Sequence, residues 1–215
     1  MTTNTSSSAS HSRTAATLRA EADYVAGRLG FWAQVLFIVA YVGILSTAMF
    51  VFQFGLGEMP CPLCITQRMA MMLASLGPVY VVTQSLRGLL TTTKFMVGLG
   101  MAVLGAIVGA IMSTRQVELH ILPGDPGYGT AIFGLHLYTW ALITFMVVLI
   151  FAGVILLFGH EFVPIAPRSR GGRRLAWIIV WALVATIAIN MLVVFAEEGF
   201  NWFLPDDPTR YMLFG

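Results

Sequence analysis

Two cysteines three residues apart, Cys61 and Cys64, are the residues of this chain best suited to chemistry. Two thiols at this C-x-x-C spacing can close a disulfide across a turn or across the first turn of a helix. Backbone N–H groups at the start of a helix stabilise a thiolate and make that sulfur more reactive. Pro62, between the two, suits the first positions of a helix. The spacing therefore predicts a redox-active dithiol at the head of a helix.

Arg68 follows Cys64 by one helical turn, so the i, i+4 rule places its guanidinium on the same face as the sulfur. This permanent cation would stabilise negative charge that develops near the sulfur. An alternative role for Arg68 is a topology anchor whose long side chain reaches the membrane interface. For Cys61 and Cys64 the alternatives are an inert structural disulfide, or half of a metal site that needs two further ligands.

The composition indicates an integral membrane protein. Hydrophobic residues make up 58% of the 215 residues and charged residues only 10%, whereas ordinary soluble domains carry about 25% charge. Several apolar runs reach the length of roughly 20 residues that crosses a hydrocarbon core of about 30 Å. The net charge is +2, and the basic residues are spread among connections instead of forming one face, which argues against nucleic-acid binding.

The apolar runs predict an all-α protein in the lipid bilayer, with a four-helix transmembrane bundle over residues 31–159 and a fifth transmembrane helix over residues 175–196. Residues 1–30, Ser/Thr-rich over most of their length, predict a disordered tail and a short lead-in. Residues 160–174 predict a basic loop, and residues 197–215 predict a tail at the membrane interface.

Three features of these segments predict local structure. Gly105 and Gly109 have the GxxxG spacing that lets helix backbones approach closely. Gly77-Pro78 predicts a kink in the second span, because proline removes a helical hydrogen bond. The acidic residues of the tail are predicted to be solvated; they are Glu197, Glu198, Asp206 and Asp207.

The distribution of basic residues predicts the orientation. Nine lie on the side that receives the N-terminus: Arg13, Arg19, Arg28, Arg87, Lys94, Arg168, Arg170, Arg173 and Arg174. Three lie on the other side: Arg68, Arg115 and Arg210. The positive-inside rule then places the N-terminus in the cytoplasm, and the cysteines and the C-terminal tail outside. That compartment is oxidising and supports disulfide chemistry.

A disulfide that serves as an oxidant must itself be re-oxidised. Because the cysteines are predicted at the lipid boundary, an electron acceptor that dissolves in lipid is favoured, and a quinone fits this requirement. Its apolar tail would lie between helices with its ring beside Cys64, and Arg68 would stabilise negative charge on a quinone oxygen.

The run P-C-P-L-C-I-T-Q-R-M-A over residues 60–70, between a first span and a kinked second one, resembles the DsbB family of disulfide bond formation proteins. The resemblance implies a four-helix bundle of the bacterial inner membrane. Such a bundle takes electrons from a periplasmic thiol oxidase of the DsbA type, or another periplasmic dithiol protein, and passes them to ubiquinone or menaquinone. It also implies that Cys61 exchanges with incoming dithiols, that Cys64 faces the quinone, and that Arg68 is the cation on the quinone side.

Two features depart from the family pattern. Typical members carry a second cysteine pair between the third and fourth spans, but residues 113–134 contain no cysteine, and a fifth span is added. Two alternatives to a catalytic dithiol therefore stay open. One is a non-catalytic accessory subunit that binds a partner through its loop and tail. The other is a metal site in which His120 and His136 join the cysteines on the outer face, although each histidine also suits a hydrogen-bonding or anchoring role at the interface.

Overall fold

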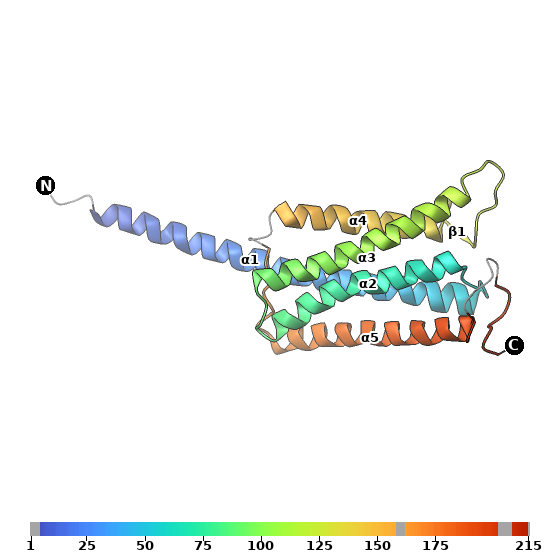
Figure 1. Cartoon of the computed structure of the whole chain (residues 1–215). Coiled ribbons are helices and arrows are strands. Elements are labelled where there is room, and N and C mark those ends of the chain that lie inside the picture. The colour runs from blue at the N-terminus through green and yellow to red at the C-terminus, as the bar shows by residue number, and fades with distance from the viewer. Residues whose placement is uncertain (1–4, 158–161, 202–207, 215) are drawn as a thin grey trace.

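The computed structural model describes residues 5–157, 162–201 and 208–214, with the backbone alone for residues 5–16 and 20. It is an all-α membrane protein with five helices long and apolar enough to cross a bilayer among the described residues (Figure 1). The elements are α1 (Thr5–Ser46), the π-helical η1 (Thr47–Gly55) that continues it, α2 (Pro62–Leu86), α3 (Thr92–Leu119), α4 (Leu137–Leu157) and α5 (Arg170–Glu198). A two-stranded hairpin, β1 (Ala131–Ile132) and β2 (Leu135–His136), precedes α4.

For three of the helices, a side chain of the residue just before the helix defines where the helix begins. The Cys61 sulfur accepts a hydrogen bond from the backbone N–H of Cys64 and so caps α2. Thr91 caps α3 and Ser169 caps α5 in the same way through their hydroxyl oxygens. Each cap satisfies a backbone donor that has no partner inside the helix. The cap of α2 therefore belongs to the dithiol itself.

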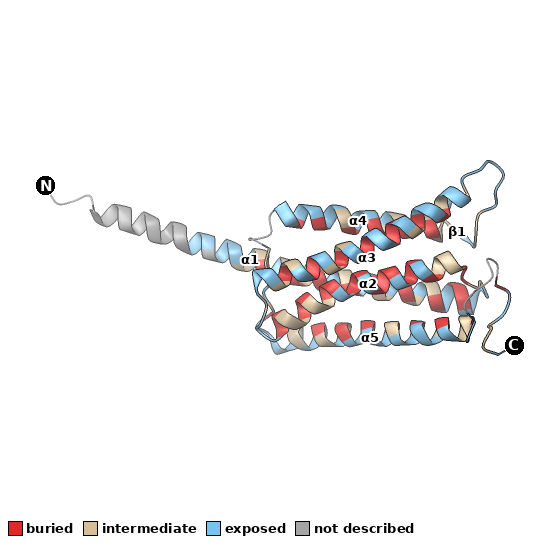
Figure 2. Ribbon diagram, in the orientation of Figure 1, coloured by how far each residue is buried: buried red, intermediate tan, exposed pale blue. Residues whose placement is uncertain are grey.

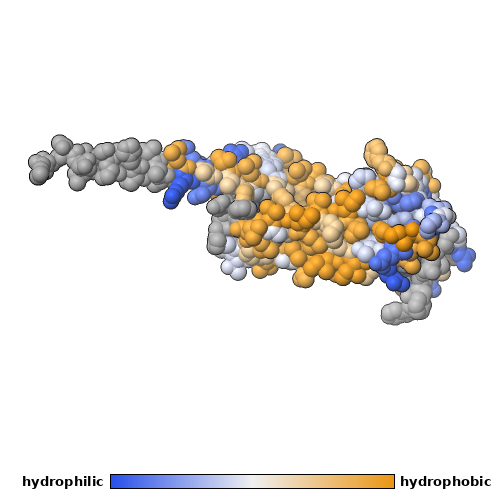
Figure 3. All heavy atoms as spheres, turned by 90° about the horizontal axis from the view of Figure 1, so that it is seen from above, coloured by the Kyte–Doolittle hydropathy of each residue, from blue (hydrophilic) through white to orange (hydrophobic). Residues whose placement is uncertain are grey.

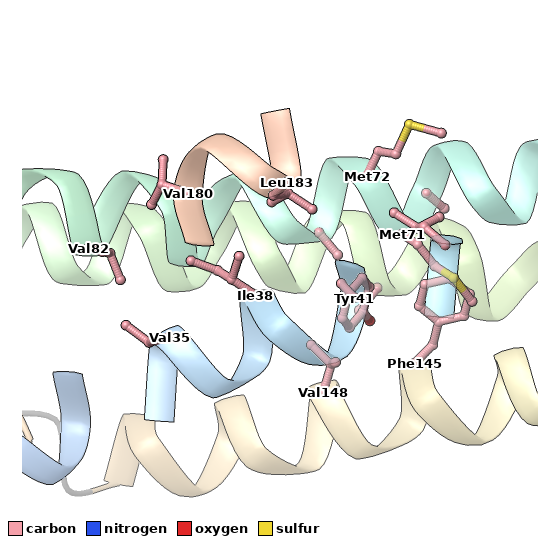
Figure 4. Close-up of a cluster of buried hydrophobic side chains, with 14 of the residues drawn as sticks. Val35, Ile38, Tyr41, Met71, Met72, Val82, Phe145, Val148, Val180 and Leu183 are labelled. Atoms are coloured by element: carbon pink, nitrogen blue, oxygen red, sulfur yellow. The ribbon is translucent and has the colours of Figure 1, made fainter. Parts of the chain in front are cut away.

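Helix α2 contacts each of the other four long helices, and consecutive spans run in opposite directions (Figure 1). The largest buried cluster joins side chains from all five long helices, and Figure 4 shows part of it. Ile38, Met71 and Leu183 are three of its members and come from three different helices. The fifth helix is thus packed on the bundle rather than separated from it.

Small residues bring α2 and α3 into backbone contact, as the GxxxG spacing predicted. A Cβ atom added at Gly105 would lie 2.4 Å from the backbone nitrogen of Ala74, and one at Gly77 would lie 2.2 Å from the carbonyl oxygen of Gly98. Gly109 faces α4 instead, against the ring of Phe145. Gly77 and Gly105 therefore tolerate no side chain without a shift of one helix, because each faces backbone atoms of the other helix.

Apolar side chains cover the outside of the bundle. Leu104, Ile150 and Leu192 are exposed on α3, α4 and α5, while the buried residues face the interior (Figure 2). Figure 3 shows hydrophobic residues across the middle of the displayed face and hydrophilic residues toward the ends. This distribution is expected of a multi-pass membrane protein, because lipid tails replace water around the spans.

The boundaries differ from the sequence-based ones at several points. Helix α1 begins at Thr5, inside the segment of residues 1–30 that was predicted as a disordered tail and a short lead-in, since the alanine-rich stretch that precedes the first span continues its helix. Helix α3 continues to Leu119 and takes in the first part of the predicted 113–134 connection. Pro78 lies inside α2, which continues without a break there, and the kink at Gly77-Pro78 stays a prediction. The η1–α2 turn, the β-hairpin and the C-terminal tail share one end of the bundle (Figure 1).

Candidate redox site

The two sulfur atoms meet at the first turn of α2. Cys61 Sγ lies 2.7 Å from Cys64 Sγ, and both residues are free thiols. Cys61 is 6% exposed and Cys64 is half-buried. The hydrogen bond with Cys64, followed by burial, raises the pKa of Cys61 above its ordinary value. The two thiols predicted at a helix head are therefore present, with their sulfur atoms in direct contact.

An amide from α3 faces both sulfurs. Gln116 Nε2 lies 3.3 Å from Cys61 Sγ and 3.4 Å from Cys64 Sγ, and it donates toward each of them. Gln116 Oε1 accepts a 2.7 Å hydrogen bond from Nε2 of Gln67 on α2. Because Gln67 holds the amide oxygen, the Gln116 N–H groups point at the sulfurs, where they stabilise negative charge.

Arg68 is buried at 8% exposure, and its guanidinium is hydrogen-bonded inside the bundle. Its Nη1 donates a 2.6 Å hydrogen bond to Oε1 of Gln53, and its Nη2 donates a 3.1 Å hydrogen bond to the carbonyl oxygen of Ala48. Both acceptors belong to η1. The π-helical turn, marked by the i→i+5 hydrogen bond from Leu56 N to Val51 O, places Gln53 inside the bundle.

Glu197 is 1% exposed, so the prediction of a solvated acidic group is wrong for this residue. It lies in the last turn of α5, and its Oε1 accepts a hydrogen bond from Gln53 Nε2. The C-terminal segment folds back over this helix end, with Met212 N bonded to the Glu197 carbonyl. Tyr211 from that segment has its hydroxyl 3.3 Å from Gln53 Nε2. Asp206 and Asp207 lie outside the described residues.

Cys64, Gln67 and Arg68 form part of the wall of a pocket of about 640 Å³. The remaining wall comes from α1 and η1, from the turn before Cys61, from the hairpin and from α4. It is mostly apolar; Ile44, Phe52 and Ile132 are among the lining residues. This volume falls within the range of roughly 300–1,000 Å³ that is typical of small-molecule sites. An apolar recess with one cation and one thiol in its wall is suited to a flat, lipid-soluble acceptor.

The connection between α3 and α4, which contains no cysteine, is hydrogen-bonded to the turn that precedes Cys61. The Tyr128 hydroxyl donates a 2.6 Å hydrogen bond to the carbonyl oxygen of Met59. Thr130 donates to the Glu58 carboxylate through both its hydroxyl and its backbone N–H. These contacts hold the segment of residues 128–130 against the turn that precedes the N-terminal end of α2.

The two histidines serve this connection and form no metal site with the cysteines. His120 Nδ1 pairs with Asp125 at 3.1 Å, and His136 Nδ1 lies 3.1 Å from the Gly129 carbonyl. Asp125 accepts from the Gly127 N–H, as expected of a turn residue; this bond, followed by His120, lowers the pKa of its carboxyl. Within the described ranges, no three His, Cys, Asp or Glu side chains come together as a ligand set.

Sequence reasoning placed Cys61, Cys64 and Arg68 in one site but missed Gln53, Gln116 and Glu197. A glutamine inside an apolar run was the available indication for Gln53, since a buried amide needs a partner. Gln116 lay beyond the predicted end of the third span. No local pattern indicated Glu197, whose hydrogen bond to Gln53 joins residues 144 positions apart.

These features define a multi-pass membrane protein with a vicinal thiol pair at one end of a helical bundle. Residues 31–130 match the family model described as disulfide bond formation protein DsbB. A protein named "Disulfide bond formation protein B" from Chromobacterium violaceum is 37% identical over 101 residues. The match covers 47% of this chain and 56% of that relative, so the chain spans little more than half the length of the curated protein it matches. No solved structure matches the chain.

Over residues 31–130 the chain is therefore similar to the DsbB family. Its connection between α3 and α4 contains no cysteine. The matched region holds Cys61, Cys64, Arg68 and the two glutamines that contact them, Gln53 and Gln116. Helix α5, with Glu197, lies outside it.

Proposed function

We propose that this chain is a membrane thiol–disulfide oxidoreductase that passes electrons from periplasmic dithiols through Cys61 and Cys64 to a membrane quinone, ubiquinone or menaquinone. One observation carries the proposal: Cys64 and Arg68 share the wall of an apolar pocket of about 640 Å³ while Cys64 Sγ contacts Cys61 Sγ. The sulfur pair thereby links the outer end of the bundle to a recess among the spans.

The first half-reaction takes place at the sulfurs. A thiolate of the donor attacks Cys61 Sγ of the Cys61–Cys64 disulfide, and the Cys64 thiolate leaves. The second donor thiol then displaces Cys61, so that the donor becomes a disulfide and the pair becomes a dithiol. Because Cys61 is 6% exposed, the donor thiol must reach it through a local opening of the outer end.

A bound quinone supplies the two-electron oxidant that returns the dithiol to a disulfide, with both protons carried away on the quinol. The chain contributes positioning and charge to this step. Gln116 holds its N–H groups toward both sulfurs and stabilises the thiolate that donates electrons. Arg68, fixed by Gln53 and Ala48, presents a buried cation to the pocket for negative charge on the acceptor.

The proposed setting is the bacterial inner membrane, with the N-terminus in the cytoplasm and the dithiol at the periplasmic face. The bias of basic residues supports this orientation. The proposed donor is a DsbA-like thiol oxidase or another periplasmic dithiol protein. Since the second cysteine pair is absent, that donor delivers electrons to Cys61 directly or through a pair supplied by another protein.

The test is quinone reduction by the full chain in lipid nanodiscs, with a reduced DsbA-like protein as donor and the quinone absorbance as readout. Cys64→Ser should abolish quinone reduction, whereas Thr66→Ser, an exposed neighbour on the same helix, should retain it. An unchanged rate in Cys64→Ser would overturn the proposal. Normal partner assembly in a Cys61→Ser/Cys64→Ser variant, combined with that unchanged rate, would favour the accessory subunit.

A further inference from the structure

Arg68 is the one cation in the wall of the pocket among the described residues, and it has no direct ion pair there. A buried guanidinium without a counter-charge is costly, because burial removes its hydration. Its two hydrogen bonds go to neutral oxygens of Gln53 and Ala48. Another group must therefore compensate its charge.

Glu197 is a buried acidic residue, and its carboxylate lacks a full set of hydrogen-bond partners among the described residues. Its carboxylate is buried, and only Oε1 has a hydrogen-bond partner, the Gln53 amide. The second oxygen, Oε2, has none among the described residues. A nearby opposite charge favours the ionised form of such a buried carboxylate.

Gln53 connects the two charges. Its Oε1 accepts from Arg68 while its Nε2 donates to Glu197, so one amide spans from the cation to the anion with both ends engaged. Tyr211 contacts the same amide from the C-terminal segment. The amide orientation is fixed on both sides, and the guanidinium is fixed with it.

We propose that Glu197, contributed by the fifth helix, is the buried counter-charge of Arg68, and that through Gln53 it positions Arg68 and sets the redox equilibrium of Cys61–Cys64. Helix α5 and the C-terminal segment then influence the dithiol site through their contacts with Gln53. The inference rests on the proposed function only in taking Cys61–Cys64 as the redox pair. Glu197 is a positioning residue, since it lies outside the pocket wall.

The effect has a defined sign. Reduction of the disulfide places negative charge on the sulfur beside Arg68, and a nearby carboxylate opposes that charge. Removal of the Glu197 charge therefore stabilises the dithiol, whereas removal of the Arg68 charge stabilises the disulfide. At an intermediate effective dielectric, we expect Glu197→Gln to shift the equilibrium toward the dithiol by about threefold or more, equal to ~14 mV at 29.6 mV per tenfold.

The experiment measures this equilibrium in the full chain in nanodiscs without quinone, in glutathione buffers of graded potential, with the dithiol fraction read by mass-tag alkylation. Glu198→Gln is the matched control, because Glu198 is the adjacent carboxylate and is only half-buried. We expect Glu197→Gln to shift the equilibrium as stated and Glu198→Gln to leave it within about 1.5-fold. Equal shifts in both variants would overturn the proposal.

A thermal-unfolding comparison keeps the test decisive if one variant is unstable. Arg68→Gln alone leaves the buried Glu197 carboxylate without a cation, and it should lower the unfolding midpoint. Arg68→Gln/Glu197→Gln should unfold at a higher temperature than Arg68→Gln, because the stranded charge is removed. A double variant less stable than Arg68→Gln would overturn the pairing. Quinone reduction enters neither measurement, so a failure of the proposed quinone chemistry is distinguished from a failure of this inference.

Discussion

Helix α2 has two kinds of neighbour. Toward α3 it is closed: Gly77 and Ala74 of α2 meet Gly98 and Gly105 of α3 at distances that leave no room for an added carbon. Toward α1, η1 and α4 its first turns border the pocket of about 640 Å³. The same helix is thus packed against backbone on one side and bounds an open recess on another.

This difference places two requirements of the site on different sides of α2. The side toward α3 fixes the contacts around the sulfurs, and the other side provides space for a ligand. The sulfurs and the amides that face them come from α2 and α3, the two helices held in backbone contact. The space for the proposed lipid-soluble acceptor lies on the other side, between the first turns of α2 and the α1, η1 and α4 helices. Close packing keeps the donors and acceptors around the sulfurs fixed, while the recess leaves room for a ligand without disturbing them.

A substitution at Gly105 should disrupt the backbone contact between α2 and α3. In Gly105→Val the new Cβ meets the backbone N and Cα of Ala74, which cannot rotate away as a side chain can. Overpacking of this kind costs typically 1–3 kcal/mol, and we expect the upper end, about 3 kcal/mol of unfolding free energy. Reversible unfolding in mixed detergent micelles measures it.

The control is Gly100→Val, on the same helix, where an added Cβ meets nothing within 4 Å. It carries the same loss of glycine and gain of a β-branched residue. If both variants lose equal stability, the backbone contact between α2 and α3 contributes nothing specific, and the contrast between the two sides of α2 fails.

The sequence predicted the closed side well. Five spans follow from the length of the apolar runs, and GxxxG spacing indicates close packing directly. Pro62 between two cysteines indicated a helix head, and Cys61 is indeed the residue that caps α2. These features are local, so a single sequence contains the information needed to predict them.

The surroundings of Arg68 were not predictable in the same way. Nothing in an apolar run distinguishes the i→i+5 hydrogen bonding of η1, which places Gln53 in the bundle, from an ordinary helix. Glu197 belongs to an acidic tail by composition, and only the packing of α5 and the return of the C-terminal segment bury it. Both are products of tertiary contacts.

The open side can be filled at Gly43, which lines the pocket and has nothing within 4 Å of its added Cβ. Gly43→Phe should leave stability unchanged and lower kcat/KM for quinone by about thirtyfold, or ~2 kcal/mol, through a raised KM. Steady-state quinone reduction over a range of quinone concentrations measures it.

Gly153→Phe is the matched control, because Gly153 is exposed on α4, has equally open space, and is absent from the pocket wall. It should leave both kinetic parameters unchanged. A normal KM in Gly43→Phe would remove the pocket as the quinone site while leaving the dithiol chemistry intact.

The role of the Gln116 side-chain amide, which faces both sulfurs, is tested by Gln116→Leu. This variant removes the N–H donors that face both sulfurs and leaves the Gln67 amide without its acceptor. A hydrogen bond to a charged group contributes about 1.5–3 kcal/mol, so we expect alkylation of the reduced cysteines to slow by about tenfold at neutral pH.

Gln34→Leu is the control, since Gln34 is a buried glutamine on α1 outside the site. It should leave the alkylation rate unchanged. Equal rates in wild type and Gln116→Leu would show that the backbone cap and Arg68 suffice to activate the sulfurs.

The smallest effect is expected where the cysteine-free connection meets the C-x-x-C turn. Tyr128→Phe removes the hydroxyl that donates to the Met59 carbonyl, a loss of about 1 kcal/mol. Because that carbonyl precedes Pro60 and Cys61, we expect faster amide hydrogen exchange confined to residues 55–61, with α2 and α3 unaffected. Tyr80→Phe, in the later part of α2, should cause no change in this turn. Unaltered exchange in Tyr128→Phe would mean that Glu58 and Thr130 alone hold the two connections together, so that the connection can open over the sulfurs by breaking the contacts of a single carboxylate.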